Sequence, residues 1–306
     1  MLTKSVYFRM GNWQRQFGSQ LRVVDLLQEG TTKLQDGGIA EPRLNAEWLL
    51  SNLLRKRRAE LYIDELEKPT NSEVVTKFRA LIERRLQQEP LQYLTGETEF
   101  MSLPFKVTPA VLIPRPDTEI LVEHTLQAIS PEKAIKILDI GTGCGNIAIS
   151  LAHYRPQVEI VAVDVAPEAI RLAKENAKIN KVEKQIRFLV ADVLGEDFVA
   201  QFDSKFDFVV SNPPYISEKE FSTLPIEVRQ FEPAIALQGG DDGLTFHRRI
   251  AMVTSELLTS GGQLFLEVGY NQSQMVQRIL KESGFCSIRI FQDLAGIERV
   301  VTGVVS

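Results

Sequence analysis

The sequence predicts an α/β protein in which a small helical module precedes a doubly wound, mostly parallel sheet. Three observations lead to this fold class. Apolar residues recur at spacings of three and four from residue 20 to about 88, as in amphipathic helices. Four prolines then fall in the segment from Tyr93 to Pro116, where no continuous helix can form. After Pro116, short apolar segments alternate with helical ones, which is typical of parallel strands joined by helices.

Composition narrows the class of protein. The 306 residues carry a net charge of −5, with 44% hydrophobic and 25% charged residues, as in an ordinary globular protein. Only Cys144 and Cys286 are present, and the three histidines show no ligand spacing, so we expect neither a disulfide framework nor a metal site. No stretch approaches the roughly 20 apolar residues that cross a bilayer, and we expect a cytoplasmic protein with no membrane partner.

The first 24 residues contain four basic residues and no acidic one. A transit peptide is one interpretation of this segment, but serine is scarce and no apolar core of the secretory kind is present. An extended N-terminus is therefore favoured, and Met10 is an alternative start.

We expect the helical module to cover residues 1–90. Pro42 stands where a first-turn proline would begin a helix, and Asn71 is a good N-cap for a helix that runs to Gln87. Residues 1–95 hold 15 Lys and Arg against 12 Asp and Glu, a net charge of +3, whereas the remaining chain has −8. The basic run 55–58 is either a solvated helix end or a contact surface. Two apolar faces are predicted, one with Val23, Val24, Leu26 and Leu27 and one with Leu44, Trp48, Leu49 and Leu53.

Residues 91–115 are expected to form a linker that carries a β-hairpin, because alternating pieces such as Phe105-Lys106-Val107 lie among its prolines. Residues 116–306 then form the predicted α/β domain. Helices are expected at 146–153, 167–176 and 272–282. Strands are expected at 135–139, 158–164, 186–192, 206–212, 263–268, 287–291 and 299–304.

The first four of these strands end in Asp139, Asp164, Asp192 and Asn212. In a doubly wound sheet, ligands bind at the carboxyl ends of the strands. Each acid alone could be a helix cap or a turn residue. Their recurrence at successive strand ends predicts a ligand site there.

A glycine-rich loop follows the first strand. Gly141, Gly143 and Gly145, with Thr142 and Cys144 between them, give the spacing G-x-G-x-G, which differs from the G-x-G-x-x-G of dinucleotide folds. A simple strand-to-helix turn is the alternative interpretation. Cys144 is not expected to be a nucleophile, because no histidine lies near it in the sequence.

After a strand that ends in aspartate, this loop resembles the cofactor loop of class I S-adenosylmethionine-dependent methyltransferases. The resemblance implies a seven-stranded sheet and S-adenosylmethionine as the cofactor. Asp164 could accept hydrogen bonds from both ribose hydroxyls, as an acidic residue does in dinucleotide folds. In the methyltransferase pattern, the corner at Asp192 and Val193 binds adenine.

Asn212-Pro213-Pro214-Tyr215 is the most specific motif. A planar nitrogen with a delocalised lone pair attacks a methyl group poorly. The Asn212 side-chain oxygen and the Pro213 carbonyl could accept hydrogen bonds from the two N–H groups of this nitrogen. Consecutive prolines would fix the Pro213 carbonyl in place. Tyr215 could stack on the planar group. The motif resembles that of methyltransferases acting on glutamine side chains or on adenine N6.

The chain as a whole, from about residue 20 onward, resembles the bacterial-type release-factor glutamine methyltransferases. This resemblance implies that class 1 peptide chain release factors are the protein substrate and that the glutamine of their Gly-Gly-Gln motif is methylated. Val193 stands where some relatives carry an aromatic residue. The matching segments are 90–96, 99–100, 111–119, the loop at 141–145, 212–215, 231–233, 239–244 and 293–299.

Two other functions are possible from the residues. An adenine-N6 methyltransferase of DNA or RNA can share the Asn212 motif, but the acidic catalytic half and the lack of a basic recognition domain argue against nucleic-acid binding. An adaptor with a relic α/β domain is opposed by the intact loop and motif. We expect a monomer. Phe100, Arg115 and Glu267 are further candidates for the mouth of the site, with packing roles as the alternative.

Overall fold

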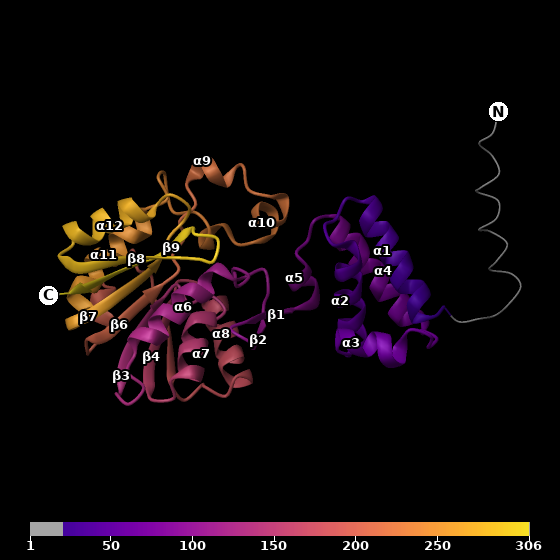
Figure 1. The fold of residues 1–306 in the computed structure, drawn as a ribbon, viewed down its shortest axis with the longest axis horizontal. Coiled ribbons are helices and arrows are strands. Elements are labelled where there is room, and N and C mark those ends of the chain that lie inside the picture. Colours follow the sequence, from indigo (N-terminus) through magenta and orange to yellow (C-terminus); the bar gives the residue numbers. More distant parts are fainter. Residues whose placement is uncertain (1–20, 306) are drawn as a thin grey trace, which may run out of the picture. The chain divides into compact units, whose positions relative to one another are not determined.

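The computed structural model describes residues 21–305, so the basic segment 1–20 and its interpretations lie outside the described residues. The chain divides into two compact units between Thr95 and Gly96 (Figure 1). Among residues 21–305, no helix combines the length and apolar character that crossing a membrane requires.

The N-terminal unit is helical. It contains α1 (Val23–Asp36), α2 (Pro42–Leu54), α3 (Arg58–Glu60), the π-helical turn Leu61–Glu65, α4 (Ser72–Leu86) and α5 (Leu91–Thr95).

Local sequence signals explain where these helices begin. Pro42 occupies the first turn of α2, and the Asn71 side chain accepts a hydrogen bond from the Val74 amide at 2.8 Å as the N-cap of α4. Both positions confirm the sequence-based expectation. Helices α1 and α4 approach closely at Gly30, where a Cβ atom would lie 2.6 Å from the Phe78 ring. The core of this unit includes Leu26, Leu27, Leu49, Leu50, Phe78 and Ile82.

The predicted apolar face of α2 is wrong in one respect, because Trp48 is 42% exposed. The helix instead buries the neighbouring stripe that contains Ala46, Leu49 and Leu50. The Arg58 guanidinium lies 5.2 Å from the centre of the Trp48 ring, so a cation–π contact accommodates the ring at the surface.

The C-terminal unit contains the hairpin and the α/β domain. Its strands are β1 (Glu97–Phe100), β2 (Leu103–Lys106), β3 (Ile135–Ile140), β4 (Val158–Asp164), β5 (Ile186–Val190), β6 (Phe206–Ser211), β7 (Leu258–Glu267), β8 (Phe285–Gln292) and β9 (Glu298–Val305). Its helices are α6 (Asp117–Ala128), α7 (Asn146–Tyr154), α8 (Pro167–Ile179), α9 (Glu218–Phe221), α10 (Ile226–Phe231), α11 (Thr245–Leu257) and α12 (Ser273–Glu282), with 3₁₀ turns at Val199–Gln201 and Ala234–Ala236.

The expected hairpin is formed by β1 and β2, which pair antiparallel. Met101 and Ser102 form its two-residue turn with φ of 51° and 59°, the left-handed backbone that a tight hairpin requires at both positions.

The seven-stranded sheet has the order β5-β4-β3-β6-β7-β9-β8, and the fold class predicted from the sequence is confirmed. Strands β3 to β7 run parallel, and β9 pairs antiparallel with both β7 and β8. Strand β7 begins five residues before the predicted position. Its early pairing, Phe206 with Leu258, is separated from the pairing of Phe208 with Gln263 by a shift in register.

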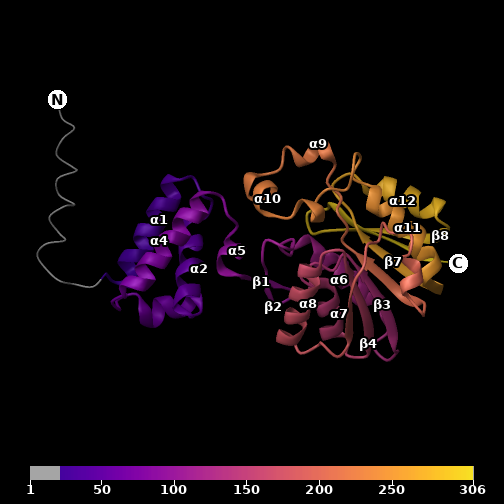
Figure 2. The same cartoon turned by 180° about the vertical axis from the view of Figure 1, so that it is seen from behind.

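Helices cover both faces of this sheet (Figures 1 and 2). From β3, the chain moves outward through α7 and α8 to β4 and β5, whereas α11 and α12 belong to the strands on the other side of β3. Right-handed crossovers that move in opposite directions place their helices on opposite faces. Helix α6 contacts α7 and therefore lies on the same face as α7.

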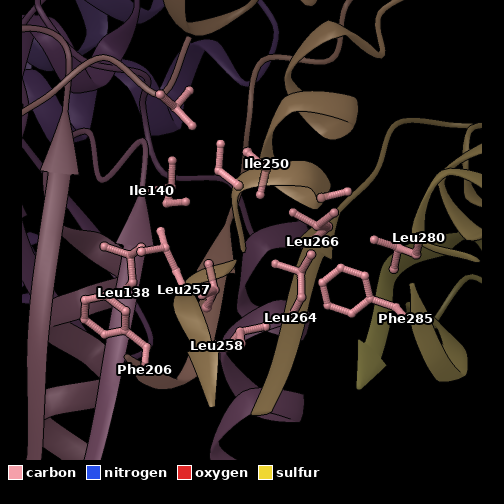
Figure 3. Packing of buried hydrophobic residues seen from close by; sticks show 14 of the residues in the cluster. Leu138, Ile140, Phe206, Ile250, Leu257, Leu258, Leu264, Leu266, Leu280 and Phe285 are labelled. Atoms are coloured by element: carbon pink, nitrogen blue, oxygen red, sulfur yellow. The ribbon is translucent and has the colours of Figure 1, made fainter. Parts of the chain in front are cut away.

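A large hydrophobic cluster lies between the sheet and the helices α11 and α12 (Figure 3). Leu138 and Leu264 point from β3 and β7 toward Ile250 and Leu257 of α11. Because these strands are fixed by packing along their length, the loops at their carboxyl ends have a rigid base.

Candidate active site

A cavity of about 260 Å³ opens at the carboxyl ends of β3, β4 and β6. Strand β3 pairs in parallel with β4 on one side and with β6 on the other. The order in which the chain adds strands to the sheet reverses at β3, and doubly wound sheets bind ligands at such a point. Ten of the residues predicted from the sequence line the cavity: Gly141, Thr142, Gly143, Cys144, Asp164, Asp192, Val193, Asn212, Pro213 and Pro214.

The glycine loop follows β3 and adopts left-handed backbone at three positions, with φ of 75° at Gly141, 56° at Gly143 and 88° at Gly145. Gly145 does not line the cavity. It allows close packing of the loop against the following helix, because a Cβ atom there would lie 2.8 Å from the Ile149 side chain. Cys144 is buried, and burial raises the pKa of its thiol to about 12. The thiol is therefore protonated at neutral pH, as expected for a residue that is not a nucleophile.

Asp139 lies beneath this loop. Its carboxylate is fully buried and accepts a hydrogen bond from the Thr142 hydroxyl at 2.7 Å. Burial raises the pKa of Asp139 to about 7. This acid at the end of the first predicted strand therefore supports the loop from below rather than facing the cavity.

Asp164 ends β4 and faces the cavity. One carboxylate oxygen accepts a hydrogen bond from the Gly143 amide at 2.8 Å, and the other accepts one from the Ala166 amide at 2.9 Å. Burial raises the pKa of Asp164, and these two amides oppose that shift by stabilising the charged form. Each oxygen keeps a lone pair, so the carboxylate can still accept hydrogen bonds from a ligand.

Asp192 and Val193 form the corner after β5. Asp192 is exposed, and its carboxylate caps the turn by accepting from the Leu194 amide at 2.9 Å. Arg249 of α11 donates to the carbonyls of Val193 at 2.8 Å and of Gly195 at 2.6 Å. Arg249 was not predicted from the sequence, because no motif or spacing distinguishes one of two adjacent arginines on a helix.

Asn212 follows β6, directly beside the glycine loop: its backbone oxygen lies 3.9 Å from the position of a Cβ atom on Gly141. Its side-chain nitrogen donates a hydrogen bond to the Thr118 hydroxyl at 3.0 Å. Thr118 is 1% exposed and also lines the cavity. The Thr118 contact was not predicted, because 94 residues separate the partners.

Tyr215 is placed differently from the rest of its motif and is not among the cavity-lining residues. Its hydroxyl donates to the Glu267 carboxylate at 3.3 Å, and its carbonyl accepts from the Gln272 side chain at 2.9 Å. Glu267 is 1% exposed at the end of β7, and burial raises its pKa to about 7. Stacking of Tyr215 on a substrate stays a prediction, whereas its anchoring role is visible in the structure.

The two weaker candidates Arg115 and Phe100 differ in position, because only Arg115 lines the cavity. Arg115 lines the cavity and forms an ion pair with Glu232, which is 5% exposed and also accepts from the Ile113 amide at 3.4 Å. Phe100 is buried and packs edge-on against Phe105, with ring centres 6.2 Å apart. Arg115 is therefore a residue of the mouth, and Phe100 has the alternative, packing role.

Comparison with known proteins identifies the family. The family model described as the PrmC N-terminal domain matches residues 25–96, and that described as the methyltransferase small domain matches residues 116–234. A release factor glutamine methyltransferase of Geobacter sulfurreducens is 43% identical over 88% of this chain and 92% of its own length. One of Moorella thermoacetica is 42% identical over 89% of this chain and 95% of its own. The chain belongs to the release factor glutamine methyltransferase family.

A solved structure supports the fold separately. A methyltransferase from Pyrococcus furiosus superposes with a TM-score of 0.50, covering 67% of this chain and 90% of its own, at 16% identity. At this identity the likeness shows the shared fold alone. As a member of its family, the chain is an S-adenosylmethionine-dependent methyltransferase with a release factor as substrate.

The cavity fits this cofactor. The left-handed glycines bring bare backbone to the cavity wall, and the Asp164 carboxylate offers acceptors for a pair of ribose hydroxyls. The wall near Asp192 is apolar, as a purine ring requires, and includes Ala191, Val193, Phe246 and Ile250.

Proposed function

We propose that this protein transfers the methyl group of S-adenosylmethionine to the side-chain nitrogen of the glutamine in the Gly-Gly-Gln motif of class 1 peptide chain release factors. By this modification it modulates translation termination. The curated relatives of similar length are named for methylation of a release factor glutamine, which supports the substrate.

One observation carries the chemistry: Asn212 and the glycine loop line the same cavity. Asn212 follows β6 and the glycine loop follows β3. These strands pair in parallel with Ile140 opposite Ser211, so the two segments leave the sheet side by side. A methyl acceptor held by Asn212 is therefore adjacent to a cofactor held by the loop. Close, aligned reactants supply most of the acceleration in a direct transfer.

We assign the acceptor positions to Asn212 and Pro213. An amide nitrogen is a weak nucleophile because its lone pair is delocalised into the carbonyl. The Asn212 side-chain oxygen and the Pro213 carbonyl accept hydrogen bonds from the two N–H groups of the substrate nitrogen. These bonds favour the more pyramidal nitrogen of the transition state. Pro213 is buried and followed by Pro214, so its carbonyl direction is set before the substrate arrives.

The cofactor supplies a methyl group on a positively charged sulfur. We assign its ribose to Asp164, its backbone contacts to residues 141–145, and its adenine to the corner of Asp192 and Val193. The nitrogen becomes acidic once methylated, so its proton passes to solvent and no general base is needed before transfer.

Recognition of the folded substrate requires more than the cavity, and we assign this role to the helical module, residues 1–90. Its net positive charge contrasts with the acidic remainder of the chain. Residues 91–115 serve as the linker and 116–306 as the catalytic domain. We further infer a monomer that acts in the cytoplasm, where release factors work, without binding nucleic acid directly.

A methyl-transfer assay with labelled S-adenosylmethionine tests this function. We expect label in a purified class 1 release factor and none in the same factor with its Gly-Gly-Gln glutamine changed to alanine. Label in DNA or RNA, with none in the release factor, would establish the adenine-N6 alternative instead.

A further inference from the structure

The side-chain amide of Asn212 can act in catalysis in one of its two orientations. An amide presents two N–H donors on one side and an oxygen acceptor on the other, with nearly the same shape. With its oxygen toward the cavity, it accepts from the substrate N–H. If the Asn212 amide were rotated by half a turn, its own NH₂ group would face the NH₂ group of the substrate glutamine, and neither could accept a hydrogen bond from the other. A partner behind Asn212 must therefore select the orientation.

Thr118 is that partner. Its hydroxyl lies 3.0 Å from the Asn212 side-chain nitrogen, it is 1% exposed, and it stands in the first turn of α6. The Thr118 amide donates to the Arg115 carbonyl at 3.1 Å, so the backbone that carries the hydroxyl is itself fixed. A branched side chain on a helix has few rotamers, which limits where the hydroxyl points.

A hydroxyl alone does not distinguish the two orientations, because it can accept from NH₂ or donate to oxygen. It selects one when its own proton is committed elsewhere. Glu267 is the buried acid beside it: Thr118 acts to lower the pKa of the Glu267 carboxyl, as a nearby donor does. One Glu267 oxygen accepts from the Tyr215 hydroxyl at 3.3 Å, and the other, Oε2, is buried with no hydrogen-bond partner among residues 21–305. That oxygen can take the Thr118 hydroxyl proton, which leaves the hydroxyl to accept from Asn212.

We propose that Thr118, backed by Glu267, is a positioning residue that holds the Asn212 amide with its oxygen toward the cavity. This inference rests on the proposed function, because it concerns the acceptor of the substrate N–H. Thr118 acts through Asn212 and does not contact the reacting atoms. The Thr118 hydroxyl proton points toward Glu267 and is not transferred during the reaction.

Two variants with opposite expectations test the proposal. Thr118→Val keeps the branched shape and removes the hydroxyl, whereas Thr118→Ser keeps the hydroxyl and removes a methyl group. We expect Thr118→Val to slow single-turnover methylation of release factor by about tenfold, the effect of one lost hydrogen bond. Thr118→Ser should stay within about threefold of wild type. For both, S-adenosylhomocysteine affinity, KM for release factor and melting temperature should match the wild type.

A double-mutant cycle separates orientation from packing. A carboxylate at position 212 presents an acceptor in either orientation, so Asn212→Asp removes the need for selection. We expect Thr118→Val to slow the Asn212→Asp variant by a smaller factor than it slows the wild type. Equal factors in both backgrounds would overturn the proposal even if Thr118→Val alone were poorly folded.

Three further results would contradict the positioning role. They are a Thr118→Val rate within twofold of wild type, equal losses in Thr118→Val and Thr118→Ser, and a loss of cofactor affinity that matches the loss of rate. A wild-type protein that does not methylate release factor would instead contradict the proposed function, so the two failures are distinguishable.

Discussion

The Asp164 carboxylate accepts a hydrogen bond from the Gly143 amide at 2.8 Å, which ties the end of β4 to the loop that follows β3. Strands β3 and β4 are parallel neighbours, and Gly143 and Asp164 both line the cavity. Asp164 therefore shapes the glycine loop as well as offering a charge to the ligand.

Asp164→Ala should weaken S-adenosylhomocysteine binding by tenfold or more, because hydrogen bonds to a charged acceptor contribute about 1.5–3 kcal/mol each. Isothermal titration calorimetry measures this. Asp207→Ala is the matched control: its carboxylate accepts from the Lys136 amide at 2.8 Å and does not line the cavity. Equal affinities for wild type and Asp164→Ala would remove Asp164 from the site.

Asn212→Ala should lose turnover much more than binding. Its oxygen matters most as the substrate nitrogen pyramidalises, so removal should lower the single-turnover rate by about a hundredfold, as for other donors or acceptors aimed at a transition state. S-adenosylhomocysteine affinity should change little. A methyl-transfer rate within a few-fold of wild type would contradict the role assigned to Asn212.

Glu267→Gln should change the pH dependence of stability. Burial raises the folded-state pKa of Glu267 from 4.5 to about 7. The folded state then holds this proton more tightly than the unfolded state, and the stability so gained is lost as pH rises through 7. Each pKa unit corresponds to about 1.4 kcal/mol. Glutamine cannot ionise, so the melting temperature of Glu267→Gln relative to wild type should rise from pH 5 to pH 8. A flat or falling difference would show that Glu267 stays ionised in the fold.

Much of this site follows from the sequence because strand ends and loops are local signals. The glycine spacing, Asp164 and Asn212 each stand at the end of an apolar run, and the parallel sheet brings those ends to one edge. The Asn71 cap and Pro42 start were likewise readable from a few neighbouring residues.

The partners behind the site were not readable. Thr118 and Asn212 are 94 residues apart, and Arg249 reaches Val193 across 56. Such contacts depend on how α6 and α11 pack against the sheet, which no local pattern specifies. Trp48 illustrates the same limit, because a stacked arginine lets a large apolar ring remain at the surface.

Arg57→Glu should slow methylation of intact release factor if the basic run of the module steers the substrate. The Arg57 side chain is 85% exposed, so reversing its charge leaves the core intact. We expect kcat/KM to fall by several-fold at low salt and the difference to shrink as salt rises, as for a long-range charge effect. Lys184→Glu, an equal charge change at an exposed site in the C-terminal unit, is the control. Equal effects of both variants would show that net charge alone matters.

Tandem mass spectrometry of a class 1 release factor, after incubation with this protein and S-adenosylmethionine, tests the proposed glutamine methylation most directly. We expect one added methyl group on the side-chain nitrogen of the Gly-Gly-Gln glutamine, present with wild type and nearly absent with Asn212→Ala. A methyl group on any other residue, or an unmodified glutamine after prolonged incubation with protein that binds S-adenosylhomocysteine, would contradict it.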